Sequence, residues 1–253
     1  MLFGKLIELE AIELNQEVIM VIFIALGFAA ICIGAGWYLE RRRSRAIASS
    51  PIVKQKSYQL QFHKLIAPAG IYFSPTHSWA HLTTAGRARV GVDAFIQGLT
   101  GILSAVTVQN DESEIRQGDP LFQLELEDRN LSISAPISGR VVATNTEALQ
   151  NMRQVHNNPY KAGWLVEIVP SDWENETQRL YLGKKTVNWL KAEMTRVRDF
   201  FAHSFSSPDE KLGAVLLQEG GDIAEGALAF ADKDLWASFQ DQILDPANVD
   251  LIE

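Results

Sequence analysis

Hydrophobic residues are unevenly distributed along the chain, and the longest apolar run lies near the N-terminus. Residues Val18–Leu39 read VIMVIFIALGFAAICIGAGWYL, which is 22 positions without a charged side chain. At about 1.5 Å per residue, a helix of this length spans roughly 33 Å and exceeds a bilayer core of about 30 Å. The run is too long for a signal peptide and has no polar face for a soluble helix. We therefore expect a transmembrane helix over residues 18–39.

Charges on the two sides of this segment predict its orientation. Four arginines lie between positions 41 and 45, whereas residues 1–17 contain four glutamates and Lys5 as their sole cation. Because positively charged flanks stay in the cytoplasm, we expect residues 1–17 to be extracytoplasmic and the chain after residue 39 to be cytoplasmic. The predicted localisation is a single-pass protein of the inner (cytoplasmic) membrane. Residues 40–70 are interpreted as a basic juxtamembrane segment and linker, in which we expect the four arginines at positions 41–45 to contact anionic lipid headgroups.

From about residue 71 the pattern changes to short alternating or β-branched runs. Clusters of Gly, Pro, Asn and Asp separate these runs, which are Arg87–Val92, Ile102–Val108, Leu121–Leu126, Leu131–Ile133, Gly139–Thr144 and Trp164–Val169. Many short strands with turn signals between them predict a mainly β domain. We expect a compact antiparallel sandwich or barrel over residues 71–173.

After Asp172 the spacing of apolar residues becomes helical. Leu190, Met194, Val197 and Phe201 recur at intervals of four, three and four, which predicts an amphipathic helix over residues 182–205. Shorter helices are expected around residues 210–217 and 232–244. Residues 174–253 are therefore interpreted as a C-terminal helical extension.

This extension is strongly acidic at its end. Residues 206–253 contain eleven Asp or Glu and two Lys, whereas the whole chain has a net charge of −8. Such a segment is either a solvated surface or a docking face for a basic partner. Apolar residues among the charges favour docking, and the partner-binding candidates are Leu190, Phe201, Trp236 and Phe239. Nucleic-acid binding is not expected, because no basic patch exceeds the juxtamembrane arginines.

The sequence contains no constellation that indicates catalysis or metal binding. His77 and His81 are four residues apart in a strand-like region, and the sole cysteine, Cys32, lies in the predicted membrane helix. There is no phosphate-binding glycine loop and no GxSxG motif. We therefore expect a protein that is not an enzyme, with no catalytic residue, no metal, no cofactor and no small-molecule substrate.

Five local motifs between residues 73 and 165 resemble the glycine cleavage H-protein family. In order they are Phe73-Ser-Pro-Thr-His77-Ser-Trp79, Val90-Gly91-Val92, Gly118-Asp-Pro-Leu121, Ala135-Pro-Ile-Ser-Gly139, and Asn158-Pro-Tyr160 followed by Gly163-Trp-Leu165. The resemblance implies a lipoyl-domain-like barrel-sandwich hybrid. It also implies a carrier whose chemistry depends on one lipoylated lysine at a hairpin tip.

That lysine is missing from this chain. The matching hairpin tip reads Glu127-Asp128-Arg129-Asn130, and no lysine occurs between Lys64 and Lys161. By the resemblance, the lipoyl-lysine position falls on Asp128, within one residue. Lipoate is joined through an amide to a lysine amine, which neither a carboxylate nor an always-charged guanidinium can replace. No lipoyl cofactor is therefore expected.

Three functions remain open from the sequence. The first is a membrane-anchored, non-lipoylated H-like protein that acts as a non-catalytic binding or assembly subunit of a membrane-associated complex. The second is a regulator or decoy that engages enzymes handling lipoylated carrier proteins. The third is a lipoyl carrier in one-carbon or sulfur chemistry that uses Lys161 or a linker lysine. The expected partners are the lipid bilayer and a protein of the complex.

Overall fold

The computed structural model describes residues 69–109, 114–204 and 223–249. The chain divides into two compact units, Met1–Lys56 and Ser57–Glu253, and all described residues belong to the second. The predicted extracytoplasmic segment 1–17, transmembrane helix 18–39 and most of the linker 40–70 lie outside the described residues. Within the three described ranges, no helix has both the length and the hydropathy needed to cross a membrane.

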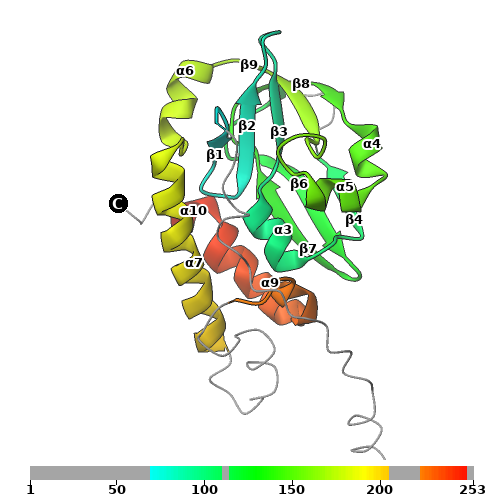
Figure 1. The fold of residues 1–253 in the computed structure, drawn as a ribbon, viewed down its shortest axis with the longest axis vertical. Coiled ribbons are helices and arrows are strands. Elements are labelled where there is room, and N and C mark those ends of the chain that lie inside the picture. The colour runs from blue at the N-terminus through cyan, green and yellow to red at the C-terminus, as the bar shows by residue number, and fades with distance from the viewer. Residues whose placement is uncertain (1–68, 110–113, 205–222, 250–253) are drawn as a thin grey trace, which may run out of the picture. The chain divides into compact units, whose positions relative to one another are not determined.

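The described residues form a mainly β domain with two sheets, as the strand pattern predicted (Figure 1). The six-stranded sheet has the spatial order β1 (Tyr72–Phe73), β2 (Ser78–Leu82), β3 (Ala88–Val92), β9 (Val166–Pro170), β8 (Gly139–Thr144) and β5 (Glu114–Ile115). The three-stranded sheet has the order β4 (Ala105–Val108), β6 (Pro120–Leu126) and β7 (Arg129–Ser134). Neighbouring strands pair antiparallel throughout both sheets.

Helices lie between the strands and follow the last one. Those within the β domain are α3 (Ala94–Thr100), α4 (Thr146–Leu149) and α5 (Met152–Asn157). Those of the extension are α6 (Trp173–Glu176), η1 (Thr177–Arg179), α7 (Lys184–Ser204), η2 (Ala227–Phe230), α9 (Lys233–Phe239), η3 (Gln240–Leu244) and α10 (Pro246–Val249). The helices predicted over 182–205 and 232–244 are thus present, and the one predicted over 210–217 lies outside the described residues.

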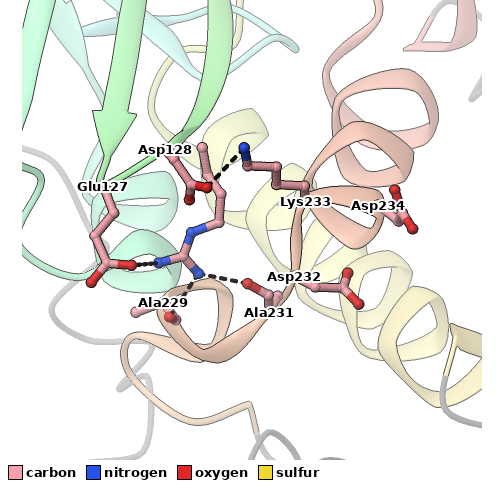
Figure 2. A pocket seen from close by; sticks show the side chains of 8 residues that line it. Glu127, Asp128, Ala229, Ala231, Asp232, Lys233 and Asp234 are labelled. Atoms are coloured by element: carbon pink, nitrogen blue, oxygen red, sulfur yellow. Dashed lines mark hydrogen bonds and ion pairs between the residues drawn. The ribbon is translucent and has the colours of Figure 1, made fainter.

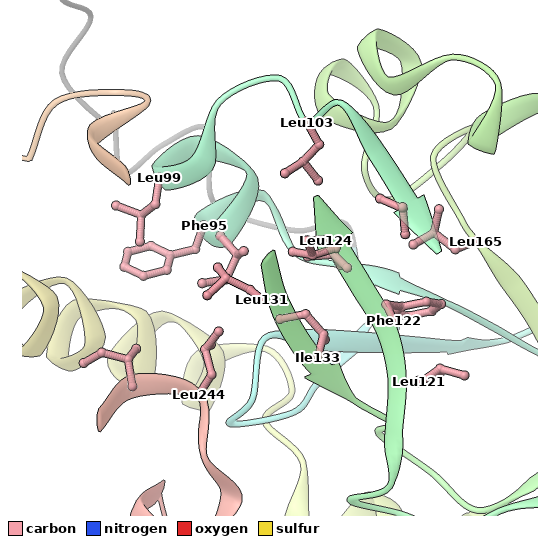
Figure 3. Close-up of a cluster of buried hydrophobic side chains, with 14 of the residues drawn as sticks. Phe95, Leu99, Leu103, Leu121, Phe122, Leu124, Leu131, Ile133, Leu165 and Leu244 are labelled. Atoms are coloured by element: carbon pink, nitrogen blue, oxygen red, sulfur yellow. The ribbon is translucent and has the colours of Figure 1, made fainter. Parts of the chain in front are cut away.

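One hydrophobic core joins the sheets to the helical extension. Figure 3 shows Phe95 and Leu99 of α3 beside Leu131 of β7, and Leu244 of η3 belongs to the same cluster. Apolar residues of α7 belong to this cluster too. The extension therefore packs on the β domain and contributes to its core.

Two glycines of the sequence motifs are required by close packing. The indole of Trp79 lies over Gly91, where an added Cβ would come within 2.9 Å of the ring. Gly139 has a φ of +154°, and an added Cβ would lie 2.2 Å from the carbonyl oxygen of Val169 on the neighbouring strand. No side chain fits at such distances, so glycine keeps β2 against β3 and β8 against β9.

Candidate functional site

The hairpin between β6 and β7 presents the tip to which the family resemblance assigns the lipoyl-lysine. Leu126 pairs with Arg129, so Glu127 and Asp128 form the two-residue turn. Glu127 has a φ of +56°. Tight hairpin turns require this left-handed region, but residues other than Gly, Asn and Asp seldom adopt it. The turn is further held by the Glu127 amide, which donates to the Ser104 hydroxyl over 3.1 Å.

A lysine from the extension approaches this tip. The Nζ of Lys233, the first residue of α9, lies 2.8 Å from Oδ2 of Asp128 (Figure 2). The hydrogen bond from Lys233 holds the pKa of Asp128 below its ordinary value. Both side chains are mostly exposed, so this ion pair contributes little to stability.

The adjacent Arg129 makes the principal contact between the tip and the extension. Its Nη1 donates to the carbonyl oxygens of Ala229 at 2.9 Å and Ala231 at 2.5 Å, and its Nη2 donates to Glu127 at 2.8 Å (Figure 2). The guanidinium also lies over the Trp236 ring, 5.4 Å from its centroid. The side chain of Arg129 is only 9% exposed. The tip is thus bound to the protein's own C-terminal segment.

The extension also covers the edge of the hairpin. Strand β7 is an edge strand of the three-stranded sheet, so the backbone groups on its outer side have no neighbouring strand to pair with. The Gln240 side chain accepts from the Ser132 amide at 2.7 Å and donates to the Ser132 carbonyl at 3.2 Å. One side chain therefore reproduces the pairing of a neighbouring strand and blocks this edge against another chain.

A hollow of about 530 Å³ lies beside the tip, between the hairpin and the start of α9. Its charged lining residues are Glu127, Asp128, Arg129, Asp232, Lys233 and Asp234 (Figure 2). The described residues contain no group of three His, Cys, Asp or Glu side chains placed to hold a metal ion. The hollow is therefore a mixed-charge surface in which both cations already bind groups of the protein.

A second polar cluster lies inside the domain, around His77. This residue is fully buried in the turn before β2, with a φ of +67°, and its ring stacks on Phe95 at 5.1 Å. Its Nδ1 lies 2.8 Å from Asp93 and its Nε2 lies 3.3 Å from Glu193 of α7. Burial alone would lower the pKa of His77, but the two carboxylates outweigh it and raise the pKa to about 9.

Glu193 continues the cluster toward the C-terminal segment. Its carboxylate accepts from Arg196 at 2.6 Å and 3.0 Å, and Arg196 donates to the Ile243 carbonyl of η3 at 2.8 Å. Burial would raise the pKa of Glu193, but His77 and Arg196 lower it below its ordinary value. Asp93, His77, Glu193 and Arg196 thus alternate in charge and link α3 to α7 and η3. We call these four residues the buried ion chain.

The four partner-binding residues expected from the sequence are placed in the core. Leu190, Phe201, Trp236 and Phe239 are each 0–1% exposed. Phe201 stacks on Phe239 at 6.4 Å, and the Trp236 Nε1 donates to the Leu228 carbonyl at 2.7 Å. Sequence reasoning placed these side chains on the surface, and the structure corrects this, because the apolar stripes of α7 and α9 face each other and the hairpin.

Sequence reasoning also missed the buried ion chain. A signal for it was present, since Glu193 lies between Leu190 and Val197 on the apolar face of its helix, where an acid requires a partner. In the sequence, His77 was noted as part of the Phe73–Trp79 motif and as half of a histidine pair, with no acidic partner assigned to it. His81 bonds instead to the Gly70 carbonyl at 3.0 Å, so the structure does not bring the two histidines together at one site.

Lys161, the alternative carrier lysine, lies far from the hairpin in sequence and in a different loop. It follows α5, where its amide donates to the Asn158 carbonyl at 3.2 Å. With Arg89, Tyr160 and Trp164 it lines a hollow of about 370 Å³. The structure therefore separates Lys161 from the β6–β7 turn.

Comparisons with known proteins agree on one family. The family model described as "Glycine cleavage H-protein" matches residues 71–193. The chain is 34% identical over 107 residues to the glycine cleavage system H protein of Hydrogenovibrio crunogenus, covering 42% of this chain and 83% of the relative. It is 30% identical over 122 residues to the probable glycine cleavage system H protein of Pyrococcus horikoshii, covering 48% of this chain and 90% of the relative.

A crystal structure of a glycine cleavage system H protein from Mycobacterium marinum is also similar. Its sequence identity is 24%, its TM-score is 0.39, and the match covers 42% of this chain and 87% of that chain. The family match ends at Glu193, so it contains three members of the buried ion chain and leaves out Arg196. The hairpin tip lies inside the matched span, whereas the residues of η2 and α9 that contact it lie beyond that span.

Proposed function

Because the chain belongs to the glycine cleavage H-protein family, we propose that it retains the family's body as a non-catalytic binding or assembly subunit and carries no lipoate. The subunit is anchored by residues 18–39 at the inner face of the cytoplasmic membrane. The observation that carries this proposal is the hairpin tip. Its turn holds Asp128 where the family resemblance expects an acylatable lysine, and its Arg129 binds the protein's own extension.

The tip supports assembly more than a regulatory role toward lipoyl-handling enzymes. Such enzymes would have to recognise the hairpin, yet Arg129 is buried under η2 and α9, and Gln240 covers the edge of β7. A surface that the protein itself binds is not offered to a second protein unless the extension is displaced. Assembly needs no free tip, because any exposed part of the domain can contact a partner.

One observation favours a second candidate function, a lipoyl carrier that uses a lysine from outside the hairpin. Lys233 places its amine 2.8 Å from Asp128, beside the position of the missing lysine, and its side chain is 63% exposed. Against this candidate, the amine belongs to the first turn of a helix and forms an ion pair with the tip. A lipoyl adduct on Lys233 is the result that would establish this alternative.

Intact-mass measurement tests the absence of lipoate. The full-length chain is purified from cells that are supplied with lipoate and contain lipoylating enzymes, together with a genuine H protein as the positive control. We expect the unmodified mass for this chain and the adduct for the control. An adduct that disappears in Lys233→Arg would overturn the proposal in favour of the carrier.

Affinity purification in mild detergent tests the assembly role. A tag after Glu253 is used to recover the full-length chain, and an untagged strain gives the background. We expect integral-membrane chains in constant stoichiometry with the tagged protein. Recovery of enzymes that act on lipoylated proteins would instead support the regulator, and recovery of the tagged protein alone would contradict assembly.

A further inference from the structure

Helix α7 has two chemically different faces. One face is buried against the sheets and the C-terminal helices and contains Leu190, Val197 and Phe201. The other is exposed and contains the cations Lys184, Lys185, Lys191 and Arg198, which we call the α7 basic face. Figure 1 shows α7 at the margin of the domain, with α9 and α10 on its inner side. The basic face thus points away from the core.

The sequence around this face contains more cations than acids. Residues 179–198 contain six Lys or Arg and a single acid, Glu193, in a chain whose net charge is −8. Glu193 is buried and binds His77 and Arg196. On the exposed side, Asp199 lies 3.5 Å from Arg198, and both side chains are about half exposed. Lys184, Lys191 and Arg198 follow one another at seven-residue spacing and therefore share one side of the helix.

An exposed apolar residue precedes α7 in the sequence. Leu182 is 40% exposed and immediately precedes Gly183 and α7. An apolar side chain next to a row of lysines and arginines is typical of segments that lie in the interface of a bilayer with anionic lipids. In such segments the lysines bind the headgroups, while the apolar side chain enters the boundary of the acyl chains.

We propose that the α7 basic face, with Leu182, binds the anionic cytoplasmic leaflet and holds the domain flat against the membrane. This inference rests on the proposed function, because it takes the anchor 18–39 as given. The segment 40–70 extends to about 100 Å at most, so the domain stays within reach of the leaflet. The juxtamembrane arginines 41–45 have the same sign and meet the same lipids, which favours a bilayer over an acidic protein as the occupant.

Fluorescence of the full-length chain in nanodiscs tests the contact. An environment-sensitive fluorophore is attached to Leu182→Cys in a Cys32→Ser background. The matched control carries it at Leu82→Cys on β2, which is 38% exposed. In nanodiscs containing phosphatidylglycerol, we expect a blue-shifted emission for the label at position 182. The shift should be absent with phosphatidylcholine alone and in about 1 M salt, and the label at position 82 should not shift.

Charge variants identify the residues responsible. Replacing Lys184, Lys191 and Arg198 with Gln should abolish the shift, whereas Arg153→Gln with Lys161→Gln, two exposed cations elsewhere, should leave it intact. The α7 contact is overturned if the label at position 182 emits equally in phosphatidylglycerol and phosphatidylcholine nanodiscs. It is also overturned if the blue shift survives the replacement of Lys184, Lys191 and Arg198 with Gln. Failure of the chain to co-elute with nanodiscs refutes the anchor itself, and so the proposed function. Binding of an acidic protein without any lipid-dependent shift would replace the bilayer with a protein partner.

Discussion

The buried ion chain makes the stability of this domain depend on pH in a predictable direction. His77 has a folded-state pKa of about 9 against an unfolded value of 6.5. Protonated His77 is therefore stabilised in the folded protein, and its full contribution is present below pH 6.5. That contribution decreases as the pH rises and is lost above the folded pKa. The difference between the two pKa values corresponds to about 3 kcal/mol of unfolding free energy.

The assay is urea unfolding of residues 57–253 across a pH range of about 6 to 10, for the wild type and for His77→Asn. Asparagine removes the titrating group and tolerates the positive φ of this position. Lysines and other groups titrate in the same range, so the readout is the difference between the two curves. The wild type should exceed His77→Asn in unfolding free energy by about 3 kcal/mol more at the acidic end of the range than at the alkaline end.

His81→Asn is the matched control. His81 lies on β2, directly after the turn that holds His77, but it is partly exposed and makes its hydrogen bond to the Gly70 carbonyl, outside the ion chain. The unfolding free energy of the His81→Asn variant should keep the pH dependence of the wild type. If His77→Asn also kept that dependence, His77 would not be charged in the folded state, and the alternating arrangement of Asp93, His77 and Glu193 would be wrongly assigned.

The remaining predictions concern the core, the tip and the topology. Trp79→Ala should cost about 3–5 kcal/mol of unfolding free energy because its side chain is almost fully buried, and Trp164→Ala should cost less because it is partly exposed. Arg129→Ala should cost about 1–3 kcal/mol, because the Ala229 and Ala231 carbonyls lose a charged donor, whereas the exposed Arg87→Ala should change stability by less than about 0.5 kcal/mol. Urea unfolding of residues 57–253 measures all four. Alkaline phosphatase fused after residue 253 should be inactive, and activity there would reverse the predicted orientation.

Local patterns predicted the elements well because they depend on near neighbours in the sequence. Alternation and turn residues indicated the strands β3, β4, β6, β7, β8 and β9, and four-three-four spacing indicated α7 within two residues of its observed ends. The same spacing did not show what covers the apolar face. Leu190 and Phe201 are buried in the core of the domain, where Phe201 stacks on Phe239 of α9, so a stripe taken as a binding surface is part of the core.

The candidate site divides in the same way. The absence of a lysine between residues 64 and 161 is a covalent fact, and no folding of residues 65–160 can supply the missing amine there. The sequence by itself therefore determined that the hairpin tip is not an acylation site. The charged run 41–45 beside an uncharged run of 22 residues likewise predicts an anchor and its orientation without any tertiary information.

Only the tertiary structure decided what the tip and His77 do instead. Arg129 meets the Ala229 carbonyl across 100 residues of chain, and His77 meets Glu193 across 116. Contacts at such separations depend on how two amphipathic helices pack on a sheet, and hydrophobic periodicity states only that one face is buried. The partner of a buried polar group is set by that packing, because desolvated charges are stable only where folding brings opposite charges or hydrogen-bonding groups beside them.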